Sequence, residues 1–336
     1  MRGKKQIEVD KLTAGDIGAV PKLTVTATGD TLCDKSQILF FEEIEFPAPV
    51  TSMAIMPKAK GDEEKISAGL GKMMEEDKTI RLKHDTETKE QIISGIGEQH
   101  IEVVISKLKA KYNVDVDLKE PKVPYREAIR KSVKAEGKHK KQSGGHGQYG
   151  HVWIEFEPTD SEDLVFEEKV FGGAVPKNFF PAVEKGLRES MTKGVLAGYP
   201  VVGLKATLYD GSYHSVDSSE MAFKMAANLA YKAGLAQASP VLLEPIGTLV
   251  VNVPNANMGD VMGDVNKRRG RVLGSDPQSD GSVTITADVP MAELAKFATD
   301  LRSMTQGRGS FSFEFRAYEQ APDHIAKKII EESAKE

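Results

Sequence analysis

Residues 98–118 read EQHIEVVISKLKAKYNVDVDL, and the change of period within this stretch decides the fold of its domain. Its first part repeats apolar side chains three and four positions apart: Ile101, Val104, Ile105 and Leu108. This spacing predicts a helix over Glu98–Tyr112 with one buried face. Its last part alternates apolar residues with aspartates: Val114, Val116 and Leu118. That alternation predicts a strand next to the helix.

The residues upstream complete a domain around this helix and strand. Residues 50–55, 80–84 and 90–95 are expected to be strands, and residues 62–77 a helix. The apolar face of that helix is expected to hold four side chains: Ile66, Leu70, Met73 and Met74. The order of elements is βαββαβ, the ferredoxin-like plan, and we assign it to residues 47–121.

The same order returns in residues 242–336 without obvious sequence identity. Asp280-Gly281 is typical of a hairpin turn within it. Its elements are expected in this order: a strand at 249–253, a helix at 258–265, a strand from 283, a helix at 294–301, a strand at 311–315 and a last helix at 323–335.

Residues 122–241 and 1–46 have other patterns. The expected elements of 122–241 are a strand at 152–156, a helix at 180–193, a strand at 202–208 and a helix at 218–235 with Met221, Met225 and Leu229 at helical spacing. Residues 1–46 are expected to finish a β-barrel that begins outside this chain, with strands at 12–20 and 38–41. The fold class is therefore α+β, with two ferredoxin-like domains flanking a third domain.

Composition narrows the class of protein. The chain has 336 residues, of which 40% are hydrophobic and 28% charged, as in soluble globular proteins of two or three domains. No apolar run reaches the roughly 18 residues that a membrane helix needs. Cys33 is the single cysteine, which excludes an internal disulfide and fits a reducing, cytoplasmic setting. The net charge of −5 argues against a dedicated nucleic-acid binder, although lysines and arginines gather locally.

Several enzyme motifs are excluded. Gly145–Gly150 matches G-x-G-x-x-G, but it precedes a strand, whereas a dinucleotide or kinase loop needs a different context. The pair Gly71-Lys72 lacks the glycine and hydroxyl of a phosphate loop, because Ile66 and Met73 stand there. The seven histidines show no metal-ligand spacing, and no catalytic acid–base pair stands out. We therefore expect no metal site and no catalytic residue.

Two polar loops remain as candidate sites. The first, residues 134–149, combines glycines with Lys138, Lys140 and Lys141, which suit RNA phosphates as well as a solvated hairpin. The second, residues 209–217, holds Tyr213 and His214, which can stack on or hydrogen-bond to RNA bases.

Two further features of the sequence admit a structural interpretation. Asp217 and Glu220 have capping-box spacing, so Asp217 is expected to cap the next helix. A basic run is compatible equally with ribosomal RNA contact and with helix capping: Lys267, Arg268, Arg269 and Arg271.

Five stretches resemble elongation factor G, in family order. SGIGEQHIE at 94–102 is similar to domain III and GDVMGDVNKRRG at 259–270 to domain V. QSGGHGQYGHV at 142–152 and GSYHSVDSSEMAF at 211–223 are similar to the two tip loops of domain IV. AGDIGAV at 14–20 resembles the end of the family's β-barrel domain II.

The resemblance implies a fold for the middle domain and roles for its loops. Domain IV of this family has a ribosomal-protein-like fold with a left-handed βαβ crossover, and its tip enters the decoding region of the ribosome. His214 matches the tip histidine of the family. The first tip loop matches at Gln148 and at three residues before it: Ser143, Gly144 and Gly145. Ser215 stands where an acidic residue is usual, and His146 where arginine is frequent.

The resemblance also implies a function and partners. It implies the ribosome-binding C-terminal part of a translational GTPase that promotes GTP-dependent translocation of tRNA and mRNA. GTP and Mg²⁺ would belong to an N-terminal domain, so this chain is not expected to be an enzyme. Expected partners are ribosomal RNA and proteins, tRNA and mRNA, bound by a cytoplasmic monomer. The alternatives are a specialised paralogue in ribosome recycling or protection and, on fold alone, a small-molecule enzyme.

Overall fold

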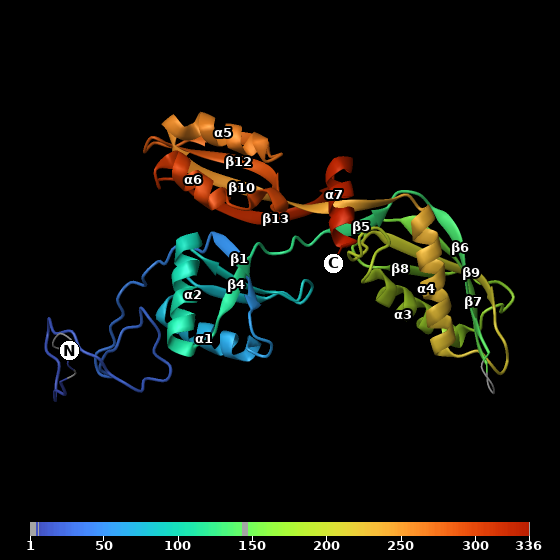
Figure 1. Ribbon diagram of the computed structural model, residues 1–336, viewed down its shortest axis with the longest axis horizontal. Coiled ribbons are helices and arrows are strands. Elements are labelled where there is room, and N and C mark those ends of the chain that lie inside the picture. The colour runs from blue at the N-terminus through green and yellow to red at the C-terminus, as the bar shows by residue number, and fades with distance from the viewer. Residues whose placement is uncertain (1–4, 6, 143–146, 336) are drawn as a thin grey trace. The chain divides into compact units, whose positions relative to one another are not determined.

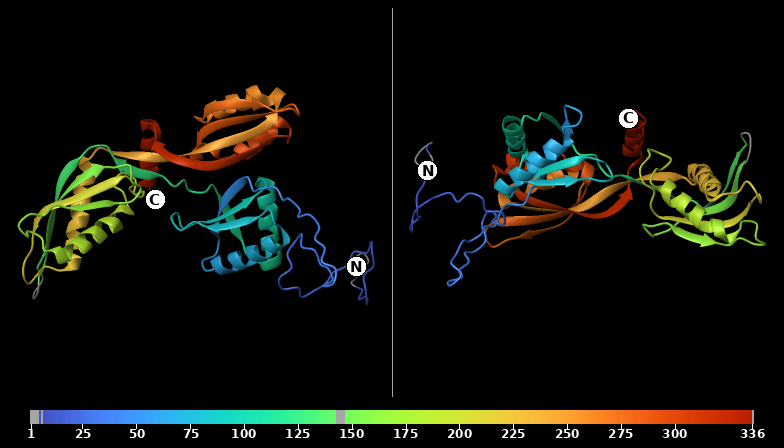
Figure 2. Two further views of the ribbon diagram at one scale, coloured as in Figure 1. Left: turned by 180° about the vertical axis from the view of Figure 1, so that it is seen from behind. Right: turned by 90° about the horizontal axis from the view of Figure 1, so that it is seen from below.

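The structure is a computed structural model that describes residues 5, 7–142 and 147–335. The chain divides into two compact units, Met1–Pro121 and Lys122–Glu336 (Figures 1 and 2). No helix in the described ranges is long and apolar enough to cross a membrane.

The first unit contains one four-stranded antiparallel sheet with two helices. Its elements are β1 (Thr51–Pro57), α1 (Glu63–Glu76), β2 (Arg81–His84), β3 (Gln91–Gly95), α2 (Glu98–Tyr112) and β4 (Val116–Lys119). The strand order β2-β3-β1-β4 is that of the predicted ferredoxin-like plan, which is confirmed. The predicted faces of both helices pack together in its core, where Ile66, Leu70 and Leu108 are fully buried.

The strands predicted at 12–20 and 38–41 are wrong. The described residues before β1 form no helix and no strand, and their apolar side chains lie in solvent. Ile17 is 96% exposed, Val25 91% and Phe40 75%. A strand needs a neighbour for its backbone hydrogen bonds, and no neighbour for these residues lies in the described part of the chain.

The second unit begins with a four-stranded sheet and two helices. Its elements are β5 (Arg126–Ile129), β6 (Val133–Lys141), β7 (Gln148–Pro158), β8 (Val165–Glu168), η1 (Lys177–Phe179), α3 (Phe180–Met191), β9 (Leu204–Ser212) and α4 (Glu220–Gln237). The sheet order is β6-β7-β9-β8, and only β8 and β9 are parallel, joined through α3. Helices α3 and α4 lie on the same side of this sheet (Figure 1).

Helix α4 packs on the β6–β7 hairpin through small residues. A Cβ atom at Gly137 would lie 2.0 Å from the carbonyl oxygen of Ala226, and one at Gly150 2.4 Å from that of Ala222. Gly150, the last glycine of the G-x-G-x-x-G match, therefore allows close packing of a helix. The alanine face of α4 is buried, whereas the predicted stripe faces solvent: Met221, Met225 and Leu229.

The rest of the second unit repeats the ferredoxin-like order. Its elements are β10 (Pro240–Pro254), η2 (Asn255–Asn257), α5 (Met258–Lys267), β11 (Arg271–Pro277), β12 (Ser282–Pro290), η3 (Met291–Leu294), α6 (Phe297–Thr305), β13 (Ser310–Gln320) and α7 (Asp323–Ser333). The order β11-β12-β10-β13 matches the first sheet, which confirms the predicted repeat. The start of β10 also pairs with β5, so one strand belongs to both parts of this unit.

Candidate nucleic-acid interface

The two polar loops meet at one end of the β6-β7-β9-β8 sheet. The N–H of Tyr149 donates to the carbonyl oxygen of Asp217 at 2.8 Å, and the hydroxyl of Ser218 donates to the carbonyl oxygen of Tyr149 at 2.9 Å. These bonds join the start of β7 to the segment before α4. We call the two joined loops the tip. Four predicted residues of the tip lie outside the described residues: Ser143, Gly144, Gly145 and His146.

Asp217 does not cap helix α4, so that prediction is wrong. Ser219 is the N-cap, and its hydroxyl oxygen accepts the N–H of Ala222 at 3.2 Å. The bridge between Tyr149 and Ser218 keeps residue 218 outside the helix, which therefore begins two residues later than predicted. The Asp217 carboxylate instead accepts the N–H of Gly147 at 2.9 Å and so ties the first loop to the second.

His214 presents one ring nitrogen to solvent. Its Nδ1 accepts the backbone N–H of Asp217 at 3.2 Å and that of Val216 at 3.4 Å. A neutral imidazole whose Nδ1 accepts carries its proton on Nε2. The side chain is 54% exposed, so Nε2–H is a donor available to a partner. Nδ1 also lies 3.3 Å from the Asp217 carboxylate.

The other predicted contact residues of the tip are also exposed. Tyr213 is 51% exposed, and Ser215 lies beside it on the same loop. Gln148 is exposed at the end of β7, where its Oε1 lies 2.9 Å from Nε2 of His139. The structure therefore gathers Gln148, Tyr213, His214 and Ser215 around one end of the domain, an arrangement that the family resemblance implied.

A hydrogen-bond chain beneath His214 was missed by sequence reasoning. The Tyr149 ring lies 6.4 Å from the His214 ring, and its hydroxyl lies 2.7 Å from Ser212 Oγ. The same Ser212 oxygen lies 2.7 Å from His151 Nδ1. On its other side, His151 Nε2 is 2.9 Å from Glu136, close enough for an ion pair but without hydrogen-bond alignment.

This chain orients Tyr149 rather than activating Ser212. The serine oxygen is engaged by Tyr149 and His151 together, so it is held in place on both sides. Alternation along β7 was the signal that could have found it, because Tyr149 and His151 share one face of that strand.

The predicted basic residues divide into free and engaged groups. Lys138, Lys140 and Lys141 are exposed on β6 and form no ion pair with any residue that the structure describes. Their charges are therefore available to an anionic partner beside the tip.

The basic run after α5 mostly stabilises the fold. Arg268 pairs with Asp264 at 2.7 Å and with Asp300, and its side chain is only 13% exposed. Arg269 forms two 2.8 Å bonds to Glu244, which raise the pKa of its guanidinium above the usual value. Both guanidinium groups are therefore engaged by carboxylates of the fold. Only Lys267 and Arg271 remain exposed.

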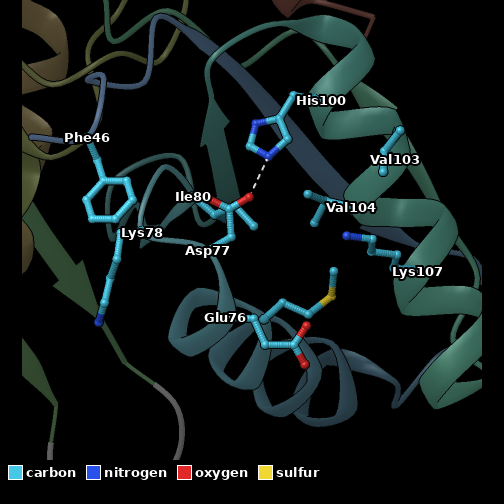
Figure 3. Close-up of a pocket in the computed structure, with 10 residues that line it drawn as sticks. Phe46, Glu76, Asp77, Lys78, Ile80, His100, Val103, Val104 and Lys107 are labelled. Carbon is cyan, nitrogen blue, oxygen red and sulfur yellow. Dashed lines mark hydrogen bonds and ion pairs between the residues drawn. The ribbon is translucent and has the colours of Figure 1, made fainter. Parts of the chain in front are cut away.

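A separate pocket of about 240 Å³ lies in the first unit, between α1 and α2 (Figure 3). His100 Nε2 lies 2.9 Å from the Asp77 carboxylate at its edge. Burial acts to raise the pKa of Asp77, but hydrogen bonds from Thr79 and His100 outweigh it and lower that pKa. Three or more potential metal ligands do not cluster anywhere in the described ranges.

The fold and the tip together define a class, the C-terminal domains of a translation elongation factor. Three family models match consecutive parts of the chain: elongation factor G domain III at 46–120, domain IV at 121–239 and the C-terminus at 241–329. The chain belongs to the elongation factor G family.

A solved structure supports this assignment. The crystal structure of a protein from Thermus thermophilus is 43% identical in sequence and superposes with a TM-score of 0.78. The match covers 87% of this chain and 44% of that chain, so the present chain spans less than half of that relative. The three matched models describe domains III to V and not a GTPase domain.

Proposed function

We propose that this chain is the ribosome-binding C-terminal part of a translational GTPase that promotes GTP-dependent movement of tRNA and mRNA. The observation that carries the proposal is the tip of domain IV, where Asp217 joins the two loops and His214 presents Nε2–H to solvent. The match to elongation factor G domains supports ribosome binding in general, and the residues of the tip support contact with RNA.

The residues of the tip have complementary roles in this proposal. His214 donates from Nε2 to an RNA acceptor, and Tyr213 offers a ring on which a base can stack. Lys138, Lys140 and Lys141 neutralise phosphates, which orients the domain without reading sequence. The proposed partners are ribosomal RNA and proteins, tRNA and mRNA, bound by a monomer in the cytoplasm.

We assign GTP binding and hydrolysis to a separate domain of the parent protein. The residues of this chain do not fit GTP or Mg²⁺, because no stretch has the glycine, lysine and hydroxyl pattern of a phosphate loop. We therefore expect the purified chain to hydrolyse no GTP. Turnover above a protein-free blank would contradict that expectation.

Two experiments test the proposal. The purified chain should sediment with ribosomes, and failure to do so would overturn ribosome binding. A full-length parent should move messenger RNA by one codon in a single-round translocation assay. GTP hydrolysis on the ribosome without such movement would overturn translocation.

The second candidate function is that of a specialised paralogue in ribosome recycling or protection. Ser215, exposed beside His214, favours it, since the family resemblance leads us to expect an acidic residue there. Subunit splitting by the parent, with no codon movement, would select this candidate.

A further inference from the structure

Within the described residues of domain IV, helices α3 and α4 cover one face of the sheet and no helix covers the other. Along β7, Val152, Ile154 and Phe156 are fully buried beneath α3 and α4. The alternate residues of β7 point to the opposite face and are only partly buried: Tyr149, His151, Trp153 and Glu155. We call this opposite face, across β6, β7 and β9, the open face.

Two large aromatic rings lie together on the open face. A bulge in the β7–β9 pairing follows Trp153 and brings Tyr209 beside it, with ring centroids 6.5 Å apart and planes tilted by 43°. Tyr149 lies on the same side of β7, nearer the tip. Half-buried aromatic rings in a row on a sheet face form a surface on which flat ligands can stack.

Lysines border these rings on the neighbouring strand. In the β6–β7 register, Lys138 stands opposite His151 and Lys140 opposite Tyr149. The ammonium of Lys134 lies 5.3 Å from the centre of the Tyr209 ring. Positive charge and aromatic surface therefore occur side by side.

Two of the carboxylates on the open face lie beside basic side chains. Glu136 lies 2.9 Å from His151, and Glu155 lies 4.0 Å from Lys134. Asp210 is exposed opposite Trp153 and accepts the N–H of Gly211. Lys138 and Lys140, by contrast, have no ion-pair partner among the residues described. The part of the face nearest the tip is therefore positive.

We infer that the open face is a second RNA surface, where unpaired bases stack on Trp153 and Tyr209 while Lys138 and Lys140 contact the phosphates. Single strands are favoured over duplexes, because only an unpaired base exposes its ring to an aromatic side chain. The surface is continuous with the tip through Tyr149. This inference rests on the proposed function, because it takes RNA as the partner.

Trp153 is the single tryptophan of the chain, so its fluorescence reports on this face directly. Titration with a short single-stranded oligouridylate should quench it saturably, whereas an RNA duplex of the same length should not. Trp153→Leu and Tyr209→Leu should each weaken binding of a labelled strand about tenfold in anisotropy, and Trp153→Phe should retain it. Matching thermal unfolding curves would show that these variants fold.

The contribution of Lys138 and Lys140 is measured by the salt dependence of RNA affinity. Replacing Lys138 and Lys140 by alanine should lower the slope of log affinity against log salt by about 1.4, at roughly 0.7 per phosphate contact. Alanine at Lys185 and Lys232, two exposed lysines on the helix side, is the matched control and should leave the slope unchanged.

Three outcomes would overturn the inference. Equal quenching by duplex or by inorganic polyphosphate would exclude stacking. Quenching by RNA-free ribosomal proteins alone would assign the face to a protein partner. If RNA does not quench Trp153 but the chain still sediments with ribosomes, the open face is not an RNA surface, and the proposed function still stands.

Discussion

Asp217 accepts a hydrogen bond from the backbone N–H of Gly147 at 2.9 Å, across a separation of 70 residues in the sequence. This bond holds the first tip loop against the second and leaves His214 in place above Tyr149. The predictions for domain IV follow from that arrangement and from the packing beneath it.

Loss of the Asp217 carboxylate should loosen the tip without unfolding α4. Asp217→Ala removes a charged hydrogen bond that contributes about 1.5–3 kcal/mol. Hydrogen exchange should accelerate at the Gly147 amide and stay slow along α4. Ser219→Ala is the matched variant, because it removes the N-cap side chain of α4. It should lower the free energy of unfolding by about 1 kcal/mol and accelerate exchange at the Ala222 amide instead. Faster exchange at the Ala222 amide in Asp217→Ala would mean that Asp217 does cap α4.

Alanine at Gly150 should destabilise the second unit. Its Cβ atom would meet the carbonyl oxygen of Ala222 at 2.4 Å, so α4 must shift. Overpacking of this kind costs about 1–3 kcal/mol, measurable by denaturant unfolding. Gly263→Ala is the control, because no atom lies within 4 Å of a Cβ there and a helical alanine should stabilise by about 0.5–1 kcal/mol.

His214 should govern movement rather than GTP hydrolysis. In the intact parent, His214→Ala should slow tRNA movement about ten- to hundredfold, the loss of one buried hydrogen bond in the bound state. Ribosome-stimulated GTP hydrolysis should be nearly unchanged. His214→Gln places an N–H near Nε2 and should recover part of the rate, whereas His214→Asn should not. Equal loss of both activities would mean that His214 acts through folding or docking.

Arg269 should contribute far more stability than Arg271. Glu244 is 4% exposed, and Arg269→Ala leaves its buried carboxylate unpaired, which costs about 3–5 kcal/mol. Arg271 pairs with the buried Asp288, but Arg316 also lies 3.4 Å from that carboxylate, so Arg271→Ala leaves it paired and should cost at most about 1 kcal/mol. Thermal unfolding of the two variants should differ accordingly. Similar melting temperatures would contradict the structural role of Arg269.

Asp77 should make the first unit sensitive to acid. Its pKa is lowered in the fold from the ordinary 3.8, so its stabilising contribution is complete above pH 3.8. That contribution is lost as the pH falls through the lowered value. Asp77→Asn should flatten this part of the pH profile of unfolding, whereas Asp10→Asn, in the exposed segment, should not. An unchanged profile in Asp77→Asn would contradict the hydrogen bonds described.

Local patterns in the sequence determined the helices and strands of the two ferredoxin-like repeats. The period of Ile101, Val104 and Leu108 predicted α2 with its observed bounds, Glu98–Tyr112, because helical spacing depends only on neighbours along the chain. The two βαββαβ orders were predicted for the same reason. Composition located the two polar loops, and the family resemblance of their motifs implied that together they form the tip.

Tertiary structure alone decided how those elements use their side chains. Met221 and Asp217 had spacings typical of a core stripe and of a cap, yet packing of α4 on Gly137 and Gly150 turned the alanine face inward. The strand-to-strand register then placed Trp153 beside Tyr209 on the sheet face opposite α3 and α4. These outcomes depend on contacts between residues far apart in the chain, and their free energy is set by shape and burial that no local pattern encodes.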